Sequence, residues 1–440
     1  MPWDQPYLED FMVRNAFTAG IDFTQYFKNR LYYIDVKGML SSLHGSAGAI
    51  TALQNSVAHY YQRASSADYL GVDPTRRSLT GTGGYVKVGR KGNAKWNFSE
   101  TFTWSSPGFD LNDMGYMKET DYLMNETEIM YRQTDIWKIF RYNAFTLSQK
   151  NMWNYGGTPF SNNASLRWQS MTMNRYEWDV KETFAWNWLD SRLLRGGPDV
   201  RFGSYFLTSA KFNTDKAKRM MFMLKYEGDH NFEGNRFNTI SPSLTFRLGN
   251  HVYLSGQLDY AWNTDEMQYV ATTSPLSSSS LAPYYYVMGH MDQKTYGLTL
   301  KLQVNVTPDI SIQFYGAPFT SIAKYDDFKL AADTKSHTFE NRFQRIDPDH
   351  LTYVDGVYTI GEGAGQMPFR NPDFRFNEFR SNLVARWEYL PGSTLYFVWE
   401  HRMSNRDNWY SSGWGSNLDR MWGLPATNTF MIKMNYWFNL

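Results

Sequence analysis

Apolar and polar residues alternate with a period of two along most of this chain. From Tyr296 to Val306 every second residue is Tyr, Leu or Val, and the residues between them are Gly or polar. Such alternation places unlike residues on the two faces of a β-strand. The turn Thr307–Asp309 follows, and a second alternating run begins at Ile310. The segment therefore predicts an antiparallel hairpin with a tight polar turn.

The same pattern recurs at 244–262 and 383–399, and it also ends the chain at 430–440. One face of this last segment carries only apolar and aromatic residues, namely Phe430, Ile432, Met434, Tyr436, Phe438 and Leu440. A strand with one such face suits the wall of an outer-membrane barrel surrounded by lipid. We expect 430–440 to be the C-terminal strand that the barrel-assembly machinery reads, with Leu440 where a terminal Phe is commoner.

The connections between strand candidates alternate between short turns and long loops. The longest loops are expected at about 41–80, 105–120, 331–374 and 404–427. Short turns at one rim and long loops at the other are typical of outer-membrane barrels. The sequence therefore predicts that 1–440 is one all-β domain, a transmembrane antiparallel β-barrel of roughly 16–18 strands with long extracellular loops.

The number of strand candidates is about 17, whereas bacterial single-chain barrels have even numbers. Two explanations remain open: one strand is miscounted, or barrel sequence precedes Met1. The tight turn after the first strand favours the second, because that strand would run towards the periplasm with no partner strand before it.

Composition narrows the class of protein. Aromatic residues make up 18% of the 440 residues, cysteine is absent, and the mean hydropathy is −0.55. No run of about 20 apolar residues is present, which argues against a helical membrane protein. The net charge of +1 indicates no nucleic-acid partner. These features favour the outer membrane of a Gram-negative cell, with membrane lipid around the wall.

Charged residues recur at inward positions near the C-terminus: Arg380, Arg386, Glu388, Glu400 and Arg402. In a barrel they would form a ladder of ion pairs lining the lumen. Such a ladder can stiffen the wall and satisfy charges that are shielded from water. It can also select ions or ligands that pass through the lumen.

Aromatic residues crowd the expected outer loops, and the candidate ligand platform consists of Trp153, Tyr155, Tyr285, Trp409 and Trp414. Aromatic faces can stack on sugar rings while polar neighbours bind the hydroxyl groups. The alternative is that these residues belong to the aromatic girdles at the membrane interfaces or pack within loops.

The sequence contains only weak motifs for a metal site or a catalytic site. Asp110, Asn112 and Asp113 resemble the start of a calcium loop, but the acidic ligand expected 12 residues from the start is missing, so an ordinary polar loop is favoured. No nucleophile elbow, zinc-protease motif or phosphate-binding loop occurs. We predict no catalytic set and no cofactor. Apolar spacing between Ala49 and Arg63 permits a short amphipathic helix in a loop or inside the lumen.

Several stretches carry a resemblance to a known family. They include Gln54–Ser56, Asp73–Arg76, Ser106–Phe109 and Arg386–Leu395, the last reading R-W-E-Y-L-P-G-S-T-L. The sequence resembles a Gram-negative envelope family with a C-terminal domain of unknown function, whose fuller members join a family-nine-type carbohydrate-binding module to a predicted outer-membrane barrel. The resemblance implies location and fold, but no activity.

Three functions follow from these features. The first is binding or passage of glycans or similar nutrients at the cell surface. The second is a structural or accessory subunit of an outer-membrane protein complex, with a filled lumen. The third and least favoured is an outer-membrane hydrolase, for which Glu362, Asp373 and Glu378 offer carboxylates without a selective spacing.

Overall fold

A computed structural model describes residues 12–63, 68–92, 94–186, 188–249, 251–276, 284–407 and 414–438. The protein is all-β, and in this part of the chain 18 strands form one large sheet. One of them, β17 (Phe343–Arg345), has three residues and pairs only with the end of β16. The other strands are long and agree with the predicted number of about 17.

Each long strand pairs in antiparallel fashion with the next long strand along the chain. The strands, in order, are β1 (Asn15–Phe27), β2 (Tyr32–His44), β3 (Ser78–Arg90), β4 (Trp96–Ser105), β5 (Tyr122–Gln133), β6 (Phe140–Trp153), β7 (Pro159–Thr172), β8 (Glu177–Trp186), β11 (Tyr205–Asn213), β12 (Met220–Asn231), β13 (Arg236–Leu248), β14 (Val252–Thr273), β15 (Tyr285–Asn305), β16 (Ile310–Ala331), β21 (Phe374–Leu390), β22 (Ser393–Asp407) and β23 (Thr427–Asn435). The hairpins predicted around Thr307–Asp309 and in 383–399 are confirmed.

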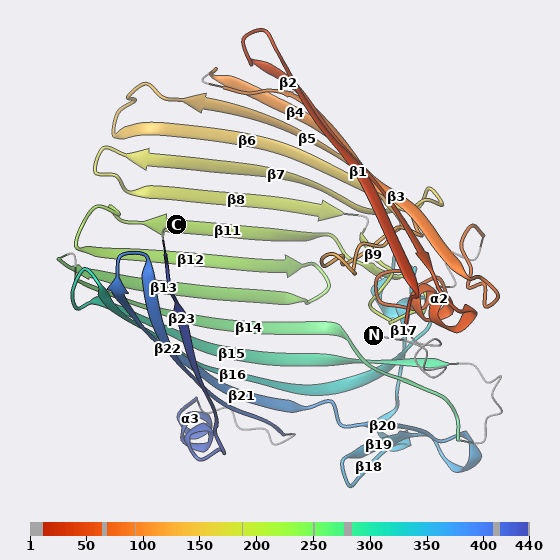
Figure 1. The fold of residues 1–440 in the computed structure, drawn as a ribbon. Coiled ribbons are helices and arrows are strands. Elements are labelled where there is room, and N and C mark those ends of the chain that lie inside the picture. The colour runs from red at the N-terminus through yellow and green to blue at the C-terminus, as the bar shows by residue number, and fades with distance from the viewer. Residues whose placement is uncertain are drawn as a thin grey trace.

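The sheet is strongly curved, so that β1–β3 and β21–β23 lie at its two edges (Figure 1). β1 pairs with β2, and β23 pairs with β22. No pairing between described residues joins β1 to β23.

The two faces of the sheet differ in chemistry. Residues directly opposite one another on paired strands share a face. Leu254, Leu302, Phe314 and Leu383 are paired in sequence across β14, β15, β16 and β21. We call the face that they share the apolar face, and the opposite face, which carries Lys301, the polar face.

All connections at one rim are short, and the long connections lie at the other rim together with two short ones, 154–158 and 232–235. The long ones contain α2 (Ala47–Gln54), η2 (Phe339–Arg342), η3 (Pro348–His350), η4 (Gly363–Gly365), α3 (Trp414–Trp422), the strand pair β9 (Trp188–Asp190) and β10 (Val200–Phe202), and the three-stranded sheet β18 (Leu351–Val354), β19 (Val357–Ile360) and β20 (Met367–Arg370). No helix in the described ranges is long and apolar enough to cross a membrane.

Loop segments pack on the polar face. Phe109 lies against Gly81 and Gly83 of β3, where an added Cβ would come within 2.1 Å of the Phe109 nitrogen and 2.4 Å of its ring. Helix α2 is shorter than the predicted 49–63 segment: Ser46 caps its start, and it ends at Asn55. The prediction was wrong in extent because the chain leaves the helix at Asn55 and then turns at Tyr60, whose φ of 47° lies outside helical geometry.

Candidate functional site

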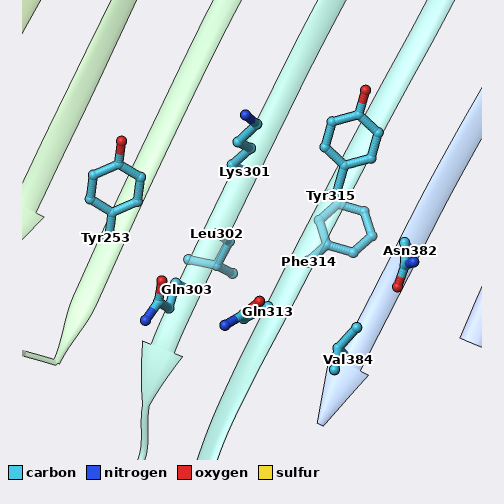
Figure 2. Close-up of a pocket in the computed structure, with 9 residues that line it drawn as sticks. All are labelled: Tyr253, Lys301, Leu302, Gln303, Gln313, Phe314, Tyr315, Asn382 and Val384. Atoms are coloured by element: carbon cyan, nitrogen blue, oxygen red, sulfur yellow. The ribbon is translucent and has the colours of Figure 1, made fainter. Parts of the chain in front are cut away.

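A depression of about 390 Å³ lies on the sheet where β14, β15, β16 and β21 run side by side (Figure 2). Its lining residues are Tyr253, Lys301, Leu302, Gln303, Gln313, Phe314, Tyr315, Asn382 and Val384. Tyr253 is the second residue of β14, and Gln313 is the fourth of β16. The depression therefore lies towards the rim of short turns, away from the long loops.

The register brings the polar lining residues together from distant parts of the sequence. Lys301 is opposite Tyr315, Tyr315 is opposite Asn382, and Asn382 is opposite Glu400. The next row joins Tyr253, Gln303, Gln313 and Val384. Two phenol rings, three amides and one ammonium group thus share one stretch of the polar face.

Some of these polar groups have unused hydrogen-bonding capacity. The Oδ1 atom of Asn382 is buried and has no hydrogen-bond partner in the described part of the chain. Lys301 forms no ion pair with any described residue. A buried acceptor without a partner is costly unless a ligand or water supplies a donor. The depression therefore has the chemistry to bind a molecule rich in hydroxyl groups.

Most of the predicted charged ladder lies beside this depression on β21 and β22. The Glu378 carboxylate accepts from Arg380 at 2.9 Å and from Arg402 at 3.0 Å. Arg380 and Arg402 are directly opposite each other, so Glu378 offsets the repulsion between two cations. Glu378 therefore connects the two arginines on the polar face.

The other ladder residues extend the charged strip. Arg386 binds Glu388 at 2.5 Å, and Glu388 also accepts from the Gly392 N–H at 3.1 Å. Glu400 is exposed beside Asn382. The strip offers both carboxylate and guanidinium groups next to the depression, so it can take part in binding a polar ligand.

The predicted aromatic platform is distributed over different parts of the molecule. Trp153 ends β6, and Tyr155 follows it in a loop, with its N–H donating to Asp121 Oδ1 at 3.0 Å. Tyr285 packs against a hydrophobic cluster built around Val287. Trp414 begins α3, which contacts β16, β21 and β22. Trp409 lies outside the described residues.

The weak calcium candidate has other partners. Asp110 is buried, and its Oδ2 lies 3.0 Å from His59 Nε2, while its Oδ1 accepts from the Asn112 N–H at 2.7 Å. Asn112 Oδ1 accepts from the Met117 N–H, and Asp113 is exposed. Among the described residues, no group of three or more His, Asp or Glu side chains could hold a metal ion.

Two buried groups of hydrogen-bonded side chains hold the long loops together, and we call each group a lock. In the first, His59 Nδ1 lies 2.8 Å from the Pro107 carbonyl and Nε2 lies 3.0 Å from Asp110 Oδ2, so the ring connects the two loops. Burial opposes ionisation of Asp110, but the bonds from His59 and Asn112 outweigh it and hold the pKa of Asp110 below its ordinary value.

A second lock is centred on Asp121, whose side chain is almost fully buried. Asp121 Oδ2 accepts from Arg63 Nη2 at 2.7 Å and from the Tyr69 hydroxyl at 2.5 Å. Burial and this bond to Asp121 raise the pKa of Tyr69 above its ordinary value. Burial raises the pKa of the neighbouring Tyr61 to about 12. The two locks join loops that are 48–58 residues apart in the sequence.

Sequence reasoning missed the depression, although the alternation from Tyr296 to Val306 placed Lys301 among the polar positions of its strand. Alternation identifies the face of each residue but not the neighbours on adjacent strands. Asn382 carried no sequence signal, because its place in the row rests on the pairing of β16 with β21, which are joined by the long connection 332–373.

Comparison with known proteins gives the family. Residues 44–440 match a family model described as a domain of unknown function (DUF5916). The match spans most of this all-β chain, so the chain belongs to that family. No curated protein matches it.

Solved structures are similar at low identity. The siderophore receptor PirA from Acinetobacter baumannii matches 95% of this chain and 70% of its own, with 9% identity and a TM-score of 0.38. The ferric enterobactin receptor PfeA from Pseudomonas aeruginosa, in complex with BCV-L6, matches 96% and 71%, with 7% identity and a TM-score of 0.42. At these scores the similarity carries no argument about function.

Proposed function

We propose that this protein is an outer-membrane β-barrel protein of a Gram-negative cell that binds glycans or similar polar nutrients on the inner wall of its lumen. Membrane placement is supported by the apolar face, where large residues such as Leu147, Leu166 and Leu300 are exposed to the surroundings. An exposed apolar face of this extent is stable in lipid and not in water.

The binding role is supported most by the unpartnered Asn382 Oδ1 within the depression. A sugar hydroxyl can donate to this atom, while Gln303 and Gln313 can donate to other hydroxyl groups. The rings of Tyr253 and Tyr315 are partly exposed and offer apolar surface against which a sugar ring can pack. A small number of polar groups that converge beside an apolar surface is typical of a small-molecule site.

The test is a calorimetric titration of the detergent-purified protein with a panel of neutral, acidic and amino oligosaccharides. Asn382→Leu and Tyr315→Ala should each weaken binding of any hit by roughly tenfold, because loss of one buried hydrogen bond or one packed ring costs about 1–1.5 kcal/mol. Thr101→Val, an isosteric change on the polar face of β4, is the matched control. Unchanged affinity in both depression variants would refute this binding site.

The second candidate function is an accessory subunit whose lumen is closed. The observation that favours it is the pair of buried locks, Asp110 with His59 and Asp121 with Arg63, which hold long loops over the polar face. Single-channel recording in planar bilayers separates the two candidates. A steady conductance that falls when an oligosaccharide binds supports passage through the lumen. Absence of conductance supports the accessory role.

A further inference from the structure

Polar residues interrupt the apolar face at Glu182 and Thr208, which are hydrogen-bonded to each other on β8 and β11, and more extensively on β4–β7. On β4–β7 the positions that should face lipid carry Glu100, Asn125, Thr127, Gln149, Asn151 and Asn162, which we call the wall patch. On β14 and β15 the corresponding face carries Leu254, Leu258, Leu298, Leu300 and Leu302 instead. The wall patch is therefore a local feature and not a property of the whole apolar face.

The wall patch lies at mid-height of the wall. On β4, Glu100 is four residues from Trp96 and four from Trp104, and all three share the apolar face. Trp residues at two heights are typical of the girdles at the two membrane interfaces. Glu100 therefore lies near the centre of the apolar band, where an ionisable side chain is costly and marks a functional site.

Hydrogen bonds within the wall patch pair only some of its polar side chains. Glu100 accepts from the Asn125 amide and from the Thr127 hydroxyl, the latter at 2.6 Å. The side chains of Gln149, Asn151 and Asn162 have no hydrogen-bond partner among the described residues. Amides that face lipid without a partner are unfavourable, so a polar surface on another membrane-embedded molecule should cover them.

We propose that the wall patch is the contact between two copies of this chain in a two-fold symmetric dimer. Every amide both donates and accepts, so a group of amides can pair with a copy of itself. Glu100, Thr127 and Gln149 occupy one register row across β4, β5 and β6. A two-fold axis over β5, parallel to the barrel axis, brings the wall patch of one copy against the wall patch of its partner, and the two Glu100 carboxylates lie on opposite sides of the axis.

This inference rests on the membrane placement proposed above, and the test separates the two. The chain has no cysteine, so single cysteines report contacts without background. Ile129→Cys lies on β5 beside the axis, and Leu300→Cys on β15 is a control of similar exposure, 43% against 40%. Both variants are oxidised in isolated outer membranes and resolved by denaturing electrophoresis without reductant.

The dimer predicts a disulfide-linked band at twice the 51.4 kDa chain mass from Ile129→Cys and none from Leu300→Cys. Adding Glu100→Leu, Asn125→Leu and Thr127→Val should reduce that band at least tenfold while the protein still reaches the membrane. Glu100→Gln, which keeps a hydrogen-bonding group, should retain it.

Three results overturn the proposal: an inserted protein with no band, equal bands from both positions, or a band that contains a different protein. An inserted protein that stays monomeric refutes the dimer alone. Absence of the protein from the outer-membrane fraction refutes the membrane placement as well, because the wall patch would then face water.

Discussion

Replacing Asp121 with Asn should release the long loops without unfolding the sheet. The Asp121 side chain is 1% exposed and that of Arg63 is 9% exposed, so the change replaces a buried carboxylate by a neutral amide and breaks this ion pair. Removing one partner of a buried ion pair costs about 3–5 kcal/mol. Asn suits the positive φ of 63° at this position as Asp does, so backbone strain adds little. We expect a loss of about 3 kcal/mol in the free energy that keeps the loops closed, which raises the population of the open loops roughly 100-fold.

The assay is hydrogen exchange of the protein in detergent. The Tyr155 N–H donates to Asp121 Oδ1, so its exchange rate reports the lock directly, and amides in the centre of β15 serve as the internal reference. Exchange at Tyr155 should accelerate by roughly 100-fold, because local opening sets the rate in folded proteins. Exchange in β15 should not change.

Asp113→Asn is the control, since it removes a carboxylate from an exposed position in the same loop as Asp121. An Asp121→Asn protein that exchanges like the Asp113→Asn protein would show that the ion pair does not hold the loops. Equal acceleration in β15 would show that the lock stabilises the whole sheet.

Three further changes test other parts of the structure. Leu300→Arg should block assembly into outer membranes, because a cation at mid-membrane on the lipid face costs about 2–4 kcal/mol, whereas Lys301→Ala should assemble normally; equal tolerance in a fractionation assay would refute the assigned faces. The pKa of Asp110 in the folded protein lies below the ordinary carboxyl pKa of 3.8. The bonds that Asp110 accepts therefore stabilise the loops fully above pH 3.8, and this stabilisation is lost as the pH falls through the lower pKa of the folded protein. The rate of limited proteolysis should be constant at pH 5–7 and should increase below about pH 3.8. Gly81→Ala should expose the loop at Phe109 to protease at neutral pH, because the new Cβ meets backbone atoms that cannot yield.

The strands and their faces could be predicted from the sequence because each depends on residues close together in the chain. The alternation from Tyr296 to Val306 and the turn at Thr307–Asp309 both lie within one hairpin, and the structure pairs them accordingly. Aromatic and aliphatic residues on one face suffice to identify that face, since the period of a strand is two.

The site could not be predicted in the same way, because it depends on contacts between distant segments. Lys301 and Asn382 share a row only because the register passes through Tyr315, and a shift of one residue in either pairing would move one of them to the other face. The partners Arg63 and Asp121 are 58 residues apart. The loops between them contain no periodic pattern from which that contact could be inferred.

The position of the depression predicts that the long loops affect the rates at which a ligand binds and leaves, and kinetic measurements can test this. The depression lies towards the rim of short turns, so a ligand that arrives from the long-loop rim must pass the segments locked by Asp121. Asp121 does not line the depression, and its substitution should leave the equilibrium affinity unchanged. Asp121→Asn should therefore speed association and dissociation by the same factor in a stopped-flow experiment. A change in affinity would show that the loops contact the ligand, and unchanged rates would show that the ligand enters from the opposite rim.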